Sequence, residues 1–134
     1  MKVLVDTCVW SLALRRKQNT DSPFVIALIE LINAGQIQII GAVRQEVLSG
    51  IKSNTQFQAL KNSLAAFPDL TLSTADFELA AEYFNLLRSK GIQGSDTDFL
   101  LCAVAVNYQL TIFTFDKDFE LFGQHLPITL YKIT

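Results

Sequence analysis

The sequence predicts an α/β fold in which helices cover both faces of a mostly parallel sheet. Short apolar runs that suit buried strands alternate along the chain with longer segments whose apolar residues recur at helical spacing. Half of the 134 residues are hydrophobic and 18% are charged, so one well-filled core is expected. We therefore expect a single domain over residues 1–134, with a sheet of about five strands.

The first half of the chain contains two of the expected strands, at residues 2–5 and 37–40. Ser22 and Pro23 mark the start of a helix, because Ser caps a helix well and Pro fits its first position. Gly35 favours the end of that helix. Further helices are predicted over residues 7–16, 42–49 and 55–67.

The second half of the chain begins with a helix that is marked at both ends. Ser73 and Asp76 form a capping-box pattern at its start, and Gly91 follows its end. A further helix, apolar on every side and so expected to be buried, begins near Ser95. The remaining strands are predicted at residues 70–72, 111–115 and 128–133.

Four acidic residues lie where a strand gives way to a helix, or in the first turns of a helix: Asp6, Glu46, Asp98 and Asp116. The functional crevice of an open α/β sheet lies beyond the carboxyl ends of its strands, where Asp6 and Asp116 are expected. Carboxylates brought together near a core need a cation, and Mg²⁺ or Mn²⁺ suits an all-oxygen cluster. The four acids therefore indicate metal-assisted hydrolysis of a phosphodiester.

Each acid also has an ordinary structural interpretation. Asp6 could cap the helix that follows it, and Glu46 could be a first-turn acid that is favoured by the helix dipole. Asp98 completes a capping pattern with Ser95. Asp116 lies in a turn, where Asp is common. Only the joint occurrence of the four at one edge of the sheet favours a site.

Composition excludes several other classes of protein. The net charge of −2 argues against a protein that binds nucleic acid through a broad basic surface. If the four acids are set aside, however, nine acidic and eleven basic residues remain. The charge balance is therefore compatible with RNA binding. Cys8 and Cys102 are expected to be buried free thiols, and His125 is expected in a surface loop. We see no signal peptide, membrane span or zinc-ligand spacing, and expect a cytoplasmic protein.

Four stretches, in order, resemble the motifs of the PIN-domain ribonucleases, and most closely the VapC toxins of bacterial toxin–antitoxin modules. They are residues 3–10, 44–50, 97–105 and 113–119, so the resemblance spans nearly the whole chain. It implies a PIN-like three-layer α/β/α sandwich around a central, mostly parallel sheet. It also implies a Mg²⁺- or Mn²⁺-dependent endoribonuclease that acts as a type II toxin.

The resemblance also implies roles for particular residues. Asp6, Glu46, Asp98 and Asp116 would be the catalytic, metal-binding acids. Asp118 matches the second acid of the last motif and is either a further ligand or a turn residue. Two polar neighbours of the acids, Thr7 and Thr114, would hold water or a carboxylate. Asp96 ranks below Asp98 as a ligand.

Several partners follow from the same resemblance. They are an RNA substrate (transfer or ribosomal RNA), a VapB-like antitoxin that covers the toxin groove, and a second copy of the chain. Arg15 and Arg16 either contact RNA or the antitoxin, or form a solvated helix end, and Trp10 could add an apolar anchor. Two alternatives remain: an RNA-processing PIN nuclease outside a toxin module, and a non-catalytic RNA- or protein-binding module.

Overall fold

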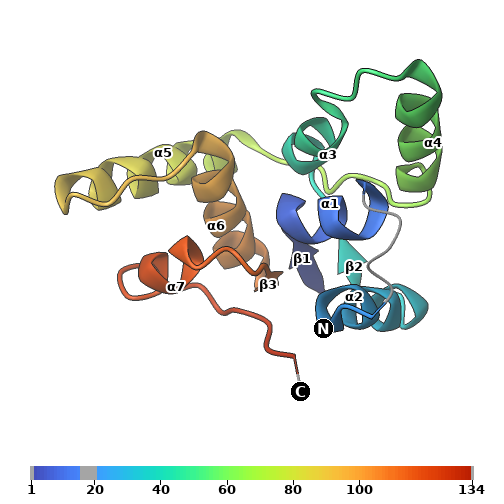
Figure 1. Ribbon diagram of the computed structural model, residues 1–134. Helices are drawn as coiled ribbons and strands as arrows, with labels where there is room; N and C mark the ends of the chain where they lie inside the picture. The colour runs from blue at the N-terminus through green and yellow to red at the C-terminus, as the bar shows by residue number, and fades with distance from the viewer. Residues whose placement is uncertain (1, 16–20, 134) are drawn as a thin grey trace.

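The computed structural model describes residues 2–15 and 21–133 (Figure 1). Within these ranges three strands and seven helices follow one another along the chain. In order they are β1 Val3–Val5, α1 Thr7–Arg15, α2 Pro23–Asn33, β2 Ile37–Gln38, α3 Gly41–Leu48, α4 Asn54–Leu64, α5 Thr74–Ser89, α6 Asp96–Tyr108, β3 Thr111–Phe113 and α7 Asp118–Phe122.

The sheet has the order β2-β1-β3, and both pairs of strands are parallel. One isolated parallel bridge extends it at each edge: Asp69 pairs with Ile39, and Leu130 pairs with Ile112. The expectation of about five strands is therefore wrong, because segments 70–72 and 128–133 form no strand. The strands that they would extend are too short to hold longer partners, since β2 has two residues and β3 has three.

Helices cover both faces of the sheet, as the predicted sandwich requires. Val3, Leu4 and Val5 of β1 are all fully buried, although successive side chains of a strand point to opposite faces. In Figure 1, α5, α6 and α7 lie to the left of the strands, α1, α3 and α4 lie above them, and α2 lies below them and to the right. Across the described ranges, no helix has the length and hydropathy that a membrane span requires.

The predicted helix starts are largely confirmed. Ser22 accepts a hydrogen bond from the amide of Phe24, with Pro23 at the first position of α2. The capping box of Ser73 and Asp76 is present at the start of α5. Two details differ: α4 ends at Leu64 instead of residue 67, and α7 was not predicted.

Candidate functional site

The site lies at the carboxyl ends of β1 and β3, the two strands between which the order of the sheet reverses. After β1 the chain passes to β2 on one side, and only later returns to β3 on the other. The amide of Asp6 donates to the carbonyl of Phe113 at 2.9 Å, so the pairing of β1 with β3 continues to the first acid. Such a reversal leaves a crevice at the strand ends, where α/β proteins commonly bind their ligands.

Asp6 is the most enclosed of the four acids, with 6% of its surface exposed. The amide of Thr7 donates to its Oδ1 at 2.7 Å. Thr114, one residue after β3, donates its hydroxyl to Oδ2 at 2.8 Å. The ends of two strands thus fix the orientation of this carboxylate.

Glu46 is the sixth of the eight residues of α3 and is exposed. The first turn of α3 contains no acid, so the helix-dipole interpretation of Glu46 is wrong. The Thr7 hydroxyl donates to Glu46 Oε1 at 2.6 Å, which joins α3 to the start of α1. Glu46 therefore lies next to the residue that follows Asp6.

Arg44 holds α3 in place relative to the segment that follows α4. Its Nε donates to Asp69 Oδ1 at 3.0 Å, and its Nη1 donates to the carbonyl of Leu64 at 2.9 Å. A third bond runs from Nη2 to the carbonyl of Phe67. Because Glu46 follows Arg44 on the same helix, these bonds also help to position the second acid.

Asp98 is the third residue of α6 and is partly buried. It forms the predicted capping box: its Oδ2 accepts from the amide of Ser95 at 3.0 Å, and its own amide donates to Ser95 Oγ at 3.1 Å. Gly94 lets this turn lie close to the core, since a Cβ there would lie 2.9 Å from the ring of Phe99 and 2.8 Å from that of Phe122. Capping and a place in the site are therefore compatible for Asp98.

Asp116 and Asp118 are both exposed at the turn between β3 and α7. The amide of Asp116 donates to Thr114 Oγ1 at 3.0 Å, and the amide of Asp118 donates to Asp116 Oδ1 at 2.9 Å. Asp116 thus has the turn geometry expected of it. Thr114 connects this turn to Asp6, because its single hydroxyl contacts both residues.

The pKa values of Asp6 and Asp98 are both raised, mainly by burial and to a smaller extent by other acids of the set. The pKa of Asp6 is about 6. Burial is the main cause of the rise and the negative charge of Asp98 contributes to it, whereas the hydrogen bond from Thr114 opposes it. Burial also raises the pKa of Asp98; its hydrogen bonds with Ser95 oppose this, and the charges of Asp116 and Glu46 add to it. Within the described residues the one salt bridge is between Arg44 and Asp69, so no Lys or Arg there forms a salt bridge with these four carboxylates.

The donor chemistry fits a hard divalent cation. Three of the acids use one oxygen in a hydrogen bond: Glu46 Oε1, Asp98 Oδ2 and Asp116 Oδ1. The second oxygen of each accepts no hydrogen bond from the residues that the structure describes. Among those residues, however, no three His, Cys, Asp or Glu side chains are grouped so that they could hold a metal ion by themselves. An ion held by one or two carboxylates, with water or phosphate oxygens as further ligands, matches the way in which Mg²⁺ commonly binds.

Of the residues proposed to contact RNA or an antitoxin, Trp10 lies elsewhere than expected. Trp10 is only 1% exposed and packs on Phe67, with 5.1 Å between ring centroids, so its prediction as a surface anchor is wrong. Arg15 is exposed at the end of α1, beside a depression that Cys8 and Gln56 also line. Arg16 lies outside the described residues.

Cys8 also lies next to the site, a position that was not predicted from the sequence. Its thiol lies 3.4 Å from Thr114 Oγ1 and 3.7 Å from Asp6 Oδ2, and burial raises its pKa. Both cysteines are free, as expected, but Cys8 is only partly buried, whereas Cys102 is fully buried. Its position in the first turn of α1, two residues after Asp6, could have indicated that Cys8 lies near the site.

Comparisons with known proteins concern the fold that carries these residues. The family model of the PIN domain matches residues 3–123. A search among curated proteins gave no significant match. Solved structures with a similar fold include FitAcB from Neisseria gonorrhoeae, with a TM-score of 0.76 and 18% identity, covering 97% of this chain and 96% of that one.

Two further structures have similar folds over their whole length. VapBC2 from Rickettsia felis, bound to a DNA fragment from its promoter, has a TM-score of 0.73 and 20% identity, covering 98% of both chains. VapBC-5 from Mycobacterium tuberculosis, a member of the VapBC family of toxin–antitoxin systems, has a TM-score of 0.69 and 16% identity, covering 99% of this chain and 100% of that one. At these identities the likeness shows a shared fold.

Proposed function

Because the chain belongs to the PIN-domain family, we propose that it is a Mg²⁺- or Mn²⁺-dependent endoribonuclease. Its catalytic acids are Asp6, Glu46, Asp98 and Asp116, with Asp118 as a further ligand from the same turn. The observation that supports this proposal is the set of hydrogen bonds that links Asp6 to two of the other acids: Thr7 contacts Asp6 and Glu46, and Thr114 contacts Asp6 and Asp116. The charge of Asp98 adds to the burial that raises the pKa of Asp6, and the charges of Asp116 and Glu46 act in the same direction on Asp98, as expected for acids of one site.

The hydrogen bonds indicate how the protein would hold its acids in place for a metal. Asp6 is held rigidly through both oxygens by Thr7 and Thr114, which suits a central ligand. The Thr7 hydroxyl orients Glu46, and the capping box orients Asp98. Each of these contacts restricts one carboxylate without neutralising its charge.

A bound divalent cation supplies a nucleophilic water near neutral pH and stabilises charge on the phosphate. The ionised acids hold the cation, and the enclosed position of Asp6 limits the access of bulk water to that carboxylate. Metal binding also favours the charged form of Asp6, which burial disfavours.

The test is cleavage of single-stranded RNA by the purified chain. We expect cleavage with Mg²⁺ or Mn²⁺, loss of cleavage on addition of EDTA, and a decrease of at least about 100-fold for Asp6→Asn or Asp98→Asn. Glu30→Gln, which changes an exposed carboxylate on α2, is the matched control and should cleave like the wild type. Full cleavage by Asp6→Asn and Asp98→Asn would refute the assignment of these acids.

We further propose that this nuclease is the toxin of a type II toxin–antitoxin pair, kept inactive by a VapB-like protein. The fold similarity to FitAcB, VapBC2 and VapBC-5 supports this reading, since the last is described as belonging to toxin–antitoxin systems. Induced expression should stop growth, and Asp98→Asn should relieve the arrest. Mapping of the cleaved RNA ends after induction would distinguish transfer RNA from ribosomal RNA.

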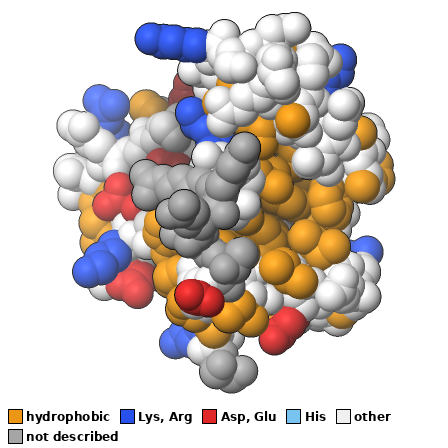
Figure 2. Space-filling model, turned by 45° about the vertical axis from the view of Figure 1, so that its right-hand side comes forward, with side chains coloured by type: hydrophobic (Ala, Val, Ile, Leu, Met, Phe, Trp, Pro, Cys, Tyr) orange, Lys and Arg blue, Asp and Glu red, His pale blue; other side chains and the backbone are white. Residues whose placement is uncertain are grey.

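A homodimer is part of the same proposal. Ile26 and Ile29, two large apolar side chains on α2, are 45% and 49% exposed. Figure 2 shows hydrophobic side chains gathered on the face where α2 and α4 lie. Sedimentation of the purified chain should give the mass of a dimer, and Ile29→Glu should shift it towards a monomer.

A further inference from the structure

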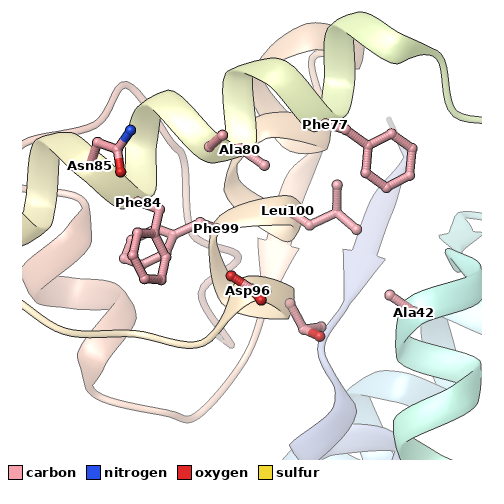
Figure 3. Close-up of a pocket in the computed structure, with 10 residues that line it drawn as sticks. Ala42, Phe77, Ala80, Phe84, Asn85, Asp96, Phe99 and Leu100 are labelled. Carbon is pink, nitrogen blue, oxygen red and sulfur yellow. The ribbon is translucent and has the colours of Figure 1, made fainter.

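A groove of about 460 Å³ lies between α3, α5 and α6, next to the acidic residues (Figure 3). Ala42 of α3 lies on one side, and Ala80 and Phe84 of α5 lie on the other. Leu100 and the first turn of α6 complete the wall. The volume lies in the range of pockets that bind small ligands.

The aromatic side chain at the mouth of this groove is unusually exposed. Phe77 is 55% exposed, and Figure 3 shows its ring over the space between α5 and α3. Phe84, deeper in the groove, packs edge-on against Phe99, with 5.6 Å between ring centroids. The Phe84 ring therefore has a structural partner, whereas much of the Phe77 ring faces the solvent.

The groove adjoins two of the proposed catalytic acids. Thr97, which lines it, directly precedes Asp98. Ala42, which also lines it, lies four residues before Glu46, about one turn away on α3. A group held in the groove would therefore be near a phosphate that is bound at the acids.

The polarity of the groove favours a neutral, flat group over a phosphate. Asp96 on its wall, with Asp98 and Glu46 nearby, repels negative charge. Asn85 and Thr97 add hydrogen-bond donors and acceptors at the edge of an otherwise apolar surface. An unstacked nucleobase meets both conditions, because it has apolar faces and a polar edge.

We propose that this groove binds a nucleobase of the RNA substrate, which stacks on Phe77 and presents its edge to Asn85, Asp96 and Thr97. The inference rests on the proposed function, and it specifies the substrate as single-stranded or looped RNA. A base in a duplex is paired and stacked, so it could enter the groove only after leaving the helix.

The test separates RNA binding from cleavage. Fluorescence anisotropy with a labelled single-stranded RNA of ten nucleotides, in EDTA, measures affinity without hydrolysis. Phe77→Ala should weaken binding roughly 5- to 100-fold, the usual effect of losing one base–aromatic stack. Leu86→Ala is the matched control, since Leu86 is 42% exposed on the same helix and does not line the groove.

A second variant gives a direct readout of stacking. Phe77→Trp should restore affinity relative to Phe77→Ala, and its new indole emission should be quenched by RNA in a saturable way, above the constant background of buried Trp10. The inference is overturned if Phe77→Ala binds RNA like the wild type, or if Phe77→Trp emission does not respond.

The two proposals fail in different ways. A wild-type chain that cleaves RNA, together with a Phe77→Ala variant of unchanged affinity and cleavage, would overturn the nucleobase groove and leave the nuclease intact. A Phe77→Ala variant that loses a VapB-like partner and keeps RNA affinity would assign the groove to that protein, and would also overturn the inference. A wild-type chain that neither binds nor cleaves RNA would overturn both proposals.

Discussion

Asp6 is the side chain in which burial and charge conflict most. Its pKa in the folded protein, about 6, lies above the ordinary value of 3.8. Between these two values the folded chain binds more protons than the unfolded chain, so the contribution of Asp6 to stability decreases as pH rises through that window. Above pH 6 the metal-free protein therefore carries a destabilising buried charge, which a bound cation would offset.

The first prediction follows from the upward direction of this pKa shift. Without metal, Asp6→Asn should be more stable than the wild type at pH 7.5, by up to about 3 kcal/mol, since the ionised form is removed. The difference should become small near pH 3, below both pKa values, where the wild-type carboxyl group is mostly protonated in the folded and the unfolded chain. Urea unfolding at the two pH values, in EDTA, measures it, and an Asp6→Asn variant that is less stable at pH 7.5 would contradict this explanation.

Individual side chains also show where the sequence was insufficient. Trp10 was expected at the surface, because helical spacing reveals one face of α1 but not that α2 and α3 both pack against this helix. The contact from Thr7 to Glu46 spans 39 residues of sequence, and no local pattern could predict it. Capping at Ser95 and Asp98 is set by neighbours within one turn and was predicted correctly.

Helix α6 connects the site to the structural core. Its first turn carries Asp98, and every residue from Phe99 to Ala105 is buried. At its other end, Asn107 and Tyr108 donate to the carboxylate of Asp76, each at 2.8 Å. Asp76 is 1% exposed and also accepts from the amide of Ser73, so it fastens the start of α5 to the end of α6.

The second prediction concerns this fastening. Asp76→Ala should destabilise the fold by about 2–4 kcal/mol, because it removes the capping box of α5 and the hydrogen bonds that Asn107 and Tyr108 donate to this buried carboxylate. Glu78→Ala, at an exposed position on the same helix, should change stability by less than about 0.5 kcal/mol. Thermal unfolding of both variants measures this, and equal effects would show that Asp76 does not fasten the two helices.

The main errors at the level of helices and strands involve short segments. The two outer strands are single bridges, and α7 has five residues. Apolar runs of four to six residues do not reveal whether a neighbouring strand is long enough to pair with them. The helices with clear start signals, α2, α5 and α6, begin within a residue of their expected positions.

For the molecule as a whole, the alternation of strands and helices was enough to predict the sandwich and the edge of the sheet at which Asp6 and Asp116 lie. The detail of the site was not predictable, because it depends on contacts between distant segments. Thr114, which follows β3, reaches Asp6 across 108 residues of sequence, and Cys8 lies between them. The groove next to Asp98 likewise arises only when α3, α5 and α6 come together.

The most direct measurement is a calorimetric titration of the metal-free chain with Mn²⁺ at neutral pH. We expect saturable binding by the wild type and by Glu30→Gln, and at least about tenfold weaker binding by Asp6→Asn and Asp98→Asn. Absence of binding by the wild type, or equal affinity in all four proteins, would contradict the claim that these acids together hold a divalent cation.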